Sequence, residues 1–294
     1  MESIVKKTTL FKSYVESPEI VLIPGVGDAL GARLVERAGF KAVFLSGYAA
    51  SASLLGAPDI GLLTMTEMAD CARRIADAVE IPLFADGDNG HGNVNNVART
   101  MRQFEKAGVA AIFFEDQVLP KRCGHMSGKQ VIPAPEMAAK IRAAVDARID
   151  SDLLIMARTD ALSVHGIDDA IGRMHLYLEA GADLSFVESP GSLDEMRRIT
   201  REIAAPNMAN MVGGGNTPLL AAKELEQLGF SIAAYPVLTT YAMVRAAERA
   251  LEHLKSRETI ADFTDTLDFS AFNELIGLEE MRAKEARFYS PLEA

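Results

Sequence analysis

The chain has 294 residues and a hydrophobic fraction of 49%, enough to build a large core in one or two domains. Its 41 acidic and 30 basic side chains give a formal charge of −11, and no run of lysine and arginine exceeds two residues. This balance excludes a general nucleic-acid-binding protein, which needs a basic face. Without a signal-peptide core or an apolar stretch of roughly 18 residues, we expect no membrane association and a soluble protein of the cytoplasm.

Short apolar runs alternate along the chain with longer segments of helical periodicity, a pattern typical of βα units. Amphipathic segments such as TMTEMADCARRIADAV and PAPEMAAKIRAAVDARI carry apolar residues at i, i+3, i+4 and i+7. Four of these segments end in a glycine suited to the left-handed conformation, at Gly39, Gly108, Gly181 and Gly229. The eight apolar runs cover residues 20–24, 42–46, 83–86, 111–115, 153–157, 184–187, 208–211 and 231–235.

Eight such units without a Gly/Ser-rich linker predict an α/β fold, a closed (β/α)8 TIM-type barrel. We expect residues 1–294 to form a single barrel domain with a C-terminal helical extension at about 270–294. An open doubly wound sheet is the alternative, which is less favoured because no G-x-G-x-x-G fingerprint follows the first run.

Catalytic side chains of such a barrel lie at the carboxyl ends of its strands, so polar residues that follow the apolar runs are candidates. Acidic groups dominate this set, with one arginine among them. The candidates are Ser46, Gly47, Tyr48, Asp86, Asp88, Glu115, Asp116, Arg158, Thr159, Asp160, Glu188, Ser189, Asn210 and the stretch 235–241.

Two aspartates follow the third run, in LFADGDNGHGN. Asp86 and Asp88 share a face of the strand, and two carboxylates in one pocket repel unless a cation or a proton lies between them. Mg²⁺ takes oxygen ligands and keeps several waters, so this pair predicts a magnesium site. Glu115 and Asp116 would complete it directly or through water. The alternative is an acidic loop that caps the next helix through Asp88 or Asn89.

Cys123 lies in PKRCGHMSGK, after the fourth run. Lys121, Arg122 and His125 surround it, and nearby cations favour the thiolate. A thiol in such a setting can donate or accept a proton, and the alternative is an incidental surface cysteine. The two glycines of the segment predict a loop that is open without ligand and ordered with it. Cys71, in contrast, lies on the apolar side of a helix and fills the core.

Arg158 ends the fifth run in MARTD. An arginine among carboxylates suits a bidentate grip on a substrate carboxylate, and the alternative is a structural salt bridge with Glu188 or Asp160. Ser46 and Gly47 offer a hydroxyl and bare backbone N–H groups to a second oxyanion, unless they form only a strand-ending turn.

Taken together, the motifs SGY, DGDNGHGN, EDQ, KRCGHMSGK, MARTD and NM…TP closely resemble the isocitrate lyase/phosphoenolpyruvate mutase superfamily, in order and spacing, over nearly the whole chain. The resemblance implies a barrel whose last helix is swapped between neighbouring subunits in a homotetramer, a dimer of helix-swapped dimers. It also implies Mg²⁺, or Mn²⁺ in its place, held by Asp86 and Asp88 with Glu115 in support. KRCGH is the signature of the carbon–carbon lyase branch.

The resemblance further implies a substrate site. Within the lyase branch, the sequence is most similar to the 2,3-dimethylmalate lyase and petal-death-protein group. Tyr241 replaces an arginine of many 2-methylisocitrate lyases, which favours a dicarboxylate. Pro236 replaces a serine of relatives that hydrolyse oxaloacetate, which favours a lyase. The implied substrate-binding residues are Ser46, Gly47, Tyr48, Cys123, Gly124, His125, Arg158, Glu188, Asn210, Pro236 and Tyr241.

The expected activity is Mg²⁺-dependent cleavage of a substituted malate, such as 2,3-dimethylmalate, to a 2-oxo acid such as pyruvate and a carboxylate. The expected catalytic residues are Cys123 as proton donor, Tyr48 as candidate base, His125 and Arg158. Three alternatives stay open: a 2-methylisocitrate lyase that forms pyruvate and succinate from a tricarboxylate, an oxaloacetate hydrolase, and a non-catalytic barrel that acts as a binding protein.

Overall fold

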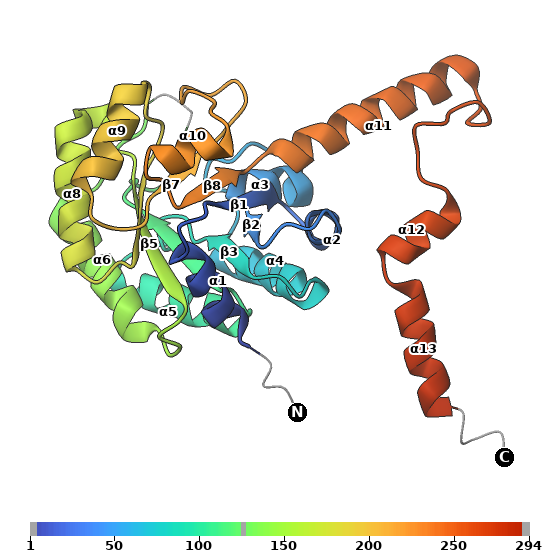
Figure 1. Ribbon diagram of the computed structural model, residues 1–294, viewed down its shortest axis with the longest axis horizontal. Helices are drawn as coiled ribbons and strands as arrows, with labels where there is room; N and C mark the ends of the chain where they lie inside the picture. Colours follow the sequence, from blue (N-terminus) through green and yellow to red (C-terminus); the bar gives the residue numbers. More distant parts are fainter. Residues whose placement is uncertain (1–4, 125–127, 290–294) are drawn as a thin grey trace. The chain divides into compact units, whose positions relative to one another are not determined.

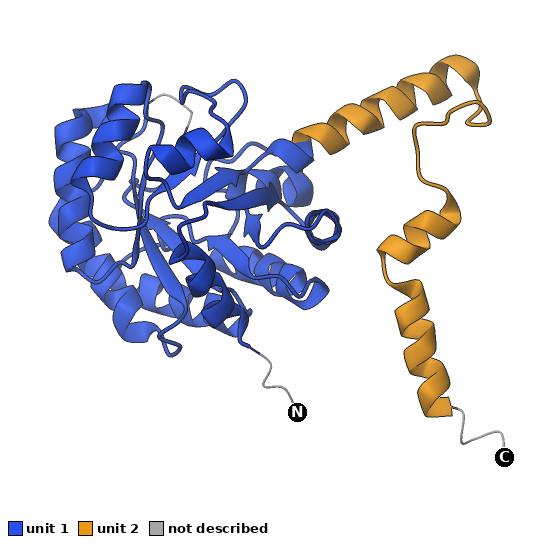
Figure 2. Cartoon of the chain, in the orientation of Figure 1, with its two compact units in different colours: residues 1–240 blue, residues 241–294 orange. Residues whose placement is uncertain are grey.

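The computed structural model describes residues 5–124 and 128–289. It divides into two compact units, Met1–Thr240 and Tyr241–Ala294, shown in blue and orange in Figure 2. The sequence predicts a single domain for residues 1–294, and that assignment stays a prediction. The first unit holds every strand of the described chain.

The first unit is a barrel of eight parallel strands, as the alternating apolar runs predict (Figure 1). The hydrogen-bonded order is β6-β5-β4-β3-β2-β1-β8-β7, and a parallel bridge between Ser185 and Asn207 joins the two ends. An open doubly wound sheet is therefore wrong. The strands are β1 Val21–Val26, β2 Val43–Leu45, β3 Leu83–Asp86, β4 Ala111–Glu115, β5 Leu154–Thr159, β6 Leu184–Val187, β7 Met208–Asn210 and β8 Ile232–Tyr235.

Helices surround the strands, and local signals fix where they begin and end. Thr64 and Glu67 form a reciprocal capping box at the start of one of them, α4. All four glycines predicted at helix ends have positive φ, from 83° to 104°. The helices of this unit are α1 Lys7–Val15, α2 Ala29–Arg37, α3 Gly47–Leu55, α4 Met65–Ala78, α5 Val94–Lys106, α6 Ala134–Ala147, α7 Leu162–His165, α8 Ile167–Glu179, α9 Leu193–Glu202, α10 Ala222–Gln227 and the start of α11 Leu238–Arg257.

Side chains alternate along each strand between the barrel interior and the layer under the helices. Leu45, Ala85 and Ile112 belong to the outer layer, which packs on the helices. The interior is a separate, aromatic-rich cluster. Its phenylalanines are Phe11, Phe44, Phe84, Phe113 and Phe186.

Helix α1 closes the amino end of the barrel. Phe11 is fully buried and its ring centroid lies 5.9 Å from that of Phe84. Polar contacts hold the helix to the loop before β5, including a 3.0 Å ion pair between Lys12 and Asp152. The carboxyl ends of the strands, at the opposite end, are therefore left to form a site.

The second unit contains the rest of α11 together with α12 Phe269–Leu275 and α13 Leu278–Tyr289. These helices expose large apolar side chains, and Phe269 and Phe288 are 85% and 62% exposed. Over the described ranges, no helix is long and apolar enough to cross a membrane.

Phe84 contacts three rings of the interior cluster, with centroid distances of 5.9, 5.6 and 6.1 Å. We expect Phe84→Ala to lower the free energy of unfolding by about 3–5 kcal/mol, because the closely packed barrel cannot fill the cavity. Urea unfolding followed by circular dichroism measures the change. Ile149→Ala, at a position that is 83% exposed, is the control and should change it by less than about 0.5 kcal/mol. An equal loss in both variants would contradict the proposed interior packing.

Candidate active site

The alternation of the strands brings most of the predicted site residues together. Phe44, Phe84 and Phe113 point into the barrel, and each is followed two positions later by a polar residue. Because residues i and i+2 of a strand share a face, these polar side chains point into the same barrel mouth. The residues placed in this way are Ser46, Asp86, Glu115, Arg158, Glu188 and Asn210, and all except Asn210 are buried.

Asp86 is fixed by two backbone N–H groups. Its Oδ2 accepts from the N–H of Gly47 at 3.1 Å and its Oδ1 from that of Asp88 at 2.9 Å. Asp88 has φ 51°, an uncommon conformation for a residue with a side chain. A Cβ on Gly47 would lie 2.7 Å from Asp86 Oδ2, so the close approach requires glycine. The N–H of Gly47 thus donates to Asp86, and the predicted contact of Ser46 and Gly47 with a second oxyanion of the substrate stays a prediction.

Ser46 acts as the N-cap of α3, since its hydroxyl accepts from the N–H of Ala49 at 3.3 Å. This is the strand-ending turn that was the alternative for Ser46 and Gly47. The corresponding alternative for Asp88 and Asn89 is wrong, because Asn93 caps α5.

Lys121 lies inside the carboxylate group. Its Nζ is 2.6 Å from Asp88 Oδ1 and 2.7 Å from Asp59 Oδ1, and its side chain is 4% exposed. Burial lowers the pKa of Lys121, but the charges of Asp88, Asp86 and Asp59 outweigh it and raise the pKa well above its ordinary value. The sequence predicts that Lys121 tunes Cys123; the structure shows that it neutralises carboxylates 33 and 62 residues earlier in the chain.

Arg158 has three carboxylate neighbours. Asp160 accepts from Nε and Nη2 at 2.9 and 3.2 Å, and Glu115 and Glu188 lie 3.3 and 3.4 Å away. The alternative of a salt bridge with Asp160 and Glu188 is therefore observed. The guanidinium also lies near two interior rings, 5.2 Å from the centroid of Phe186 and 5.5 Å from that of Phe113.

Asp116 faces away from the mouth, so the prediction that it completes a metal cage is wrong. It follows Glu115 directly, and the alternation of the strand turns it outward. Its carboxylate accepts from Thr159 at 2.7 Å, from Tyr177 at 2.9 Å and from the N–H of Asp160 at 3.0 Å. Asp116 therefore supports the backbone that carries Asp160.

Asp160 is fully buried between two cations, Arg158 and Lys129. Burial opposes its ionisation, but these charges outweigh burial and lower the pKa of Asp160 to about 2. Lys129 and Asp59 are not recognisable as site residues from the sequence. Lys129 belongs to the PKRCGHMSGK motif, and that membership is the only signal that points to it.

Cys123 is partly exposed, and its backbone N–H donates to the carbonyl of Asp59 at 3.2 Å. The neighbouring Gly124 is wedged against the arginine, because a Cβ there would lie 2.5 Å from Arg158 Nη2. Gln117 binds both backbone groups of Arg122, at 2.8 and 3.0 Å. Residues 121–124 thus pack on the site, residues 125–127 lie outside the described residues, and the predicted ordering of this segment by ligand stays a prediction.

The other predicted site residues are Asn210, Pro236, Tyr48, Tyr241 and His125. Asn210 donates to Glu188 Oε2 at 3.2 Å, and Pro236 is buried after β8, where its backbone adjoins Gly25. Tyr48 is half-buried in the first turn of α3. Tyr241 is the first residue of the second unit. His125 lies outside the described residues, and the roles of all these residues stay predictions.

Negative charge exceeds positive charge in the barrel mouth. Among the residues that the structure describes, three cations, Lys121, Lys129 and Arg158, face six carboxylates, an excess of three if all are ionised. Burial, with the charge of Asp88, raises the pKa of Asp86 to about 6. Burial likewise raises the pKa of Glu115 well above its usual range. The six carboxylates are Asp59, Asp86, Asp88, Glu115, Asp160 and Glu188.

This excess fits a divalent cation. Within the described ranges, Glu115 Oε1 is buried without a hydrogen-bond partner, and Asp88 Oδ1 has only the ion-pair contact with Lys121. No group of three His, Cys, Asp or Glu side chains among those residues can hold a metal by itself. Oxygen ligands from one or two carboxylates, completed by water, are the set that Mg²⁺ takes. The residues therefore fit Mg²⁺ but not a closed cage of protein ligands.

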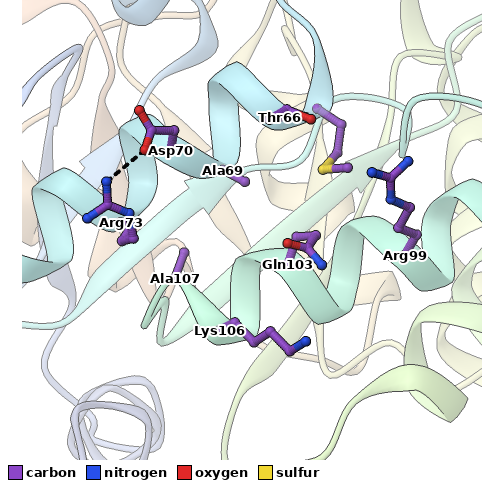
Figure 3. A pocket seen from close by; sticks show the side chains of 9 residues that line it. Thr66, Ala69, Asp70, Arg73, Arg99, Gln103, Lys106 and Ala107 are labelled. Atoms are coloured by element: carbon purple, nitrogen blue, oxygen red, sulfur yellow. Dashed lines mark hydrogen bonds and ion pairs between the residues drawn. The ribbon is translucent and has the colours of Figure 1, made fainter.

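A cavity of about 270 Å³ lies elsewhere, between α4 and α5 (Figure 3). Arg73 and Arg99 line it from the two helices. Both side chains are exposed, and Arg73 is paired with Asp70 at 2.8 Å. This cavity lacks the buried polar groups of the barrel mouth.

The fold and the charged barrel mouth define a (β/α)8-barrel enzyme. The family model for phosphoenolpyruvate phosphomutase matches residues 11–255, and the chain belongs to the phosphoenolpyruvate mutase/isocitrate lyase superfamily. It is 48% identical over 278 residues to a 2,3-dimethylmalate lyase from Eubacterium barkeri, covering 94% of this chain and 96% of that protein. A 2-methylisocitrate lyase from Aeropyrum pernix is 41% identical over 286 residues, covering 97% and 92%.

Solved structures of enzymes from this superfamily have the same fold as this chain. A crystal structure of 2,3-dimethylmalate lyase matches with a TM-score of 0.92 at 35% identity, covering 97% of this chain and 96% of that one. Oxaloacetate acetylhydrolase with 3,3-difluorooxalacetate matches at 0.90 and 33%, covering 94% and 95%. A complex of phosphonopyruvate hydrolase with oxalate and Mg²⁺ matches at 0.88 and 30%, covering 97% and 99%. The prediction that this chain is a carbon–carbon lyase is confirmed at the level of enzyme class.

The two thiols should differ in reactivity. Cys71 is 5% exposed, its Sγ contacts the carbonyl of Gly27 at 3.3 Å, and burial raises its pKa to about 11. At pH 8 it stays protonated, because the pH lies below that pKa, and the thiolate is the reactive form. We expect iodoacetamide to alkylate Cys123 at least tenfold faster than Cys71 in the native protein. Mass spectrometry of the two peptides measures both rates, and faster labelling of Cys71 would contradict the burial described above.

Proposed function

We propose that this chain is a Mg²⁺-dependent lyase that cleaves a substituted malate, such as 2,3-dimethylmalate, to a 2-oxo acid such as pyruvate and a carboxylate. The observation that carries the proposal is the barrel mouth itself. There the Asp86–Asp88 pair, Arg158 and the Cys123 segment converge, with buried carboxylate charge in excess. The 48% identity to 2,3-dimethylmalate lyase supports the choice of substrate.

Asp86 and Asp88 would hold Mg²⁺, partly through water, with Glu115 in support. A metal held there would supply positive charge to stabilise the negative charge that develops on the substrate oxygens. The Mg²⁺ complex of phosphonopyruvate hydrolase, at 30% identity, supports this assignment. Lys121 keeps Asp88 and Asp59 in place by its own charge, so the carboxylates are already ordered.

Arg158 would bind a carboxylate of the substrate. Asp160 holds one edge of the guanidinium at 2.9 and 3.2 Å, which fixes its plane. The contacts with Glu115 and Glu188, at 3.3 and 3.4 Å, are longer and can give way to an incoming carboxylate. The arginine is thus oriented before the substrate arrives.

Proton transfers would fall to Tyr48 and Cys123. As the hydroxyl of the substrate loses its proton, with Tyr48 as candidate base, its oxygen forms the new carbonyl. The bond between the carbinol carbon and its neighbour breaks, and the electron pair stays on the neighbouring carbon. Cys123 gives that carbon its proton, and the resulting thiolate is reprotonated before the next turnover.

We further propose a homotetramer built from helix-swapped dimers. The apolar side chains that the C-terminal helices expose, including Phe269 and Phe288, support this proposal because such surfaces are usually covered in solution.

Release of pyruvate from a panel of substrates tests the proposed activity. We expect kcat/KM for 2,3-dimethylmalate to exceed that for 2-methylisocitrate at least tenfold, because Tyr241 offers no charge to a third carboxylate and an unpaired buried carboxylate is costly. The opposite ranking would identify a 2-methylisocitrate lyase. Acetate and oxalate from oxaloacetate as the main reaction would identify a hydrolase, and inactivity on the whole panel would favour a binding protein.

Activity should depend on a divalent ion. Excess chelator should abolish turnover, and Asp86→Ala or Asp88→Ala should lower kcat/KM by roughly 10²-fold or more, because each removes a proposed ligand. Asp194→Ala, whose side chain is 90% exposed, is the control. Calorimetric titration of Mg²⁺ should show weaker binding in the two site variants alone. Full turnover in chelator would exclude the metal assignment.

Cys123→Ser should slow turnover with little change in ligand affinity. Serine keeps the shape but is a far weaker acid, so proton transfer should slow by roughly 10²–10⁴-fold. Turnover and inhibitor affinity are measured on the same variant. Near-normal turnover would exclude Cys123 as the acid, and lost affinity with normal turnover would make it a binding residue.

A further inference from the structure

Lys129 is a buried lysine to which the mechanism above assigns no role. Its side chain is only 3% exposed, although Lys129 lies on a loop. In the described chain this loop resumes at residue 128, after residues 121–124. An ammonium group at this depth is stable only if oxygens surround it. Its two oxygen partners come from different parts of the barrel mouth.

One partner is Asp160, whose Oδ1 lies 2.7 Å from Nζ. Asp160 is also the carboxylate that holds the edge of Arg158. The other partner is the backbone carbonyl of Gly124, at 2.5 Å. Lys129 therefore links two groups of the site. One is the Asp160 carboxylate, which orients Arg158, and the other is the backbone carbonyl of Gly124, the residue after Cys123.

Few other groups hold this carbonyl. Ser189 donates to the oxygen of Gly124 at 3.3 Å, a weaker contact that it shares with Glu188. Gly124 itself fills the space against Arg158 and Glu188, so a small shift of its backbone moves Cys123 relative to the arginine. The short bond from Lys129 is the stronger restraint on that shift, because charge-assisted hydrogen bonds exceed neutral ones.

We propose that Lys129 is a positioning residue that sets the Cys123 thiol relative to Arg158 by binding Gly124 and Asp160 together. The consequence for catalysis rests on the proposed function, whereas the consequence for the thiol does not. Substrate binding does not require Lys129, because Arg158 keeps both contacts with Asp160 and its longer contacts with Glu115 and Glu188.

The test compares Lys129→Met with Lys129→Arg in the full chain. Methionine fills a similar volume but cannot donate, whereas arginine keeps the charge and several donors. Without substrate, alkylation of Cys123 by iodoacetamide should be roughly 10- to 100-fold faster in Lys129→Met, since a charge-assisted bond that restrains the segment is lost. With substrate, kcat should fall by a similar factor while KM changes less than about threefold. Lys129→Arg should recover part of both effects.

Lys7→Met is the matched control. Lys7 is part-buried and donates to the carbonyls of Ala76 and Val79, just before β3 and away from the barrel mouth. Its loss should leave the alkylation rate of Cys123 and kcat unchanged. A change equal to that of Lys129→Met would overturn the proposal in favour of general destabilisation.

Ser189→Ala provides a second test of the proposal if Lys129→Met does not fold. It removes the weaker donor to the same carbonyl and leaves Asp160 untouched, so we expect the same pattern at about threefold. An unchanged alkylation rate in both variants, or a loss expressed only in KM, would overturn the positioning role. Faster alkylation in a protein that is inactive on every substrate would support the positioning role and refute the proposed function instead.

Discussion

The barrel mouth depends on one constraint, the burial of more negative than positive charge at the ends of its strands. Carboxylates are costly to bury unless a cation or a set of donors accompanies each of them. Asp86 receives two backbone N–H groups, Asp88 and Asp59 share the Lys121 ammonium, and Asp160 lies between two cations. These partners do not offset burial completely, because the pKa values of Asp86, Asp88 and Glu115 are all raised. A divalent cation would therefore be bound most strongly beside these three carboxylates.

The period of a β-strand explains why so much of this site is readable from the sequence. Once Phe84 and Phe113 are assigned to the interior, Asp86 and Glu115 must also point inward. The same rule places Arg158 after Met156 and Asn210 after Met208. It also explains the error at Asp116, which lies one position further on and therefore faces Arg173 and Tyr177.

Residues on loops obey no such period, and their contacts could not be predicted. Asp59 follows α3 in a segment without apolar alternation, and the charge pattern of KRCGH indicates only that Lys121 and Cys123 are neighbours in the chain. Lys121 reaches Asp88 and Asp59 because the loop folds back over the barrel, which is a tertiary event. The local sequence therefore could not indicate that Lys121 binds these two carboxylates.

Two lysines, one on each side of Cys123 in the chain, bind carboxylates on different sides of the barrel mouth. Lys121 binds the carboxylates on the Asp88 side, and Lys129 binds Asp160 on the Arg158 side. Between them, Cys123 and Gly124 are held through backbone atoms, by the carbonyl of Asp59 and by the Lys129 ammonium. A thiol on a strand would point only to one wall of the mouth. A thiol on a segment held at both walls would be able to reach a substrate carbon between the proposed metal site and Arg158, which is the arrangement that the proposed cleavage of a substituted malate would need.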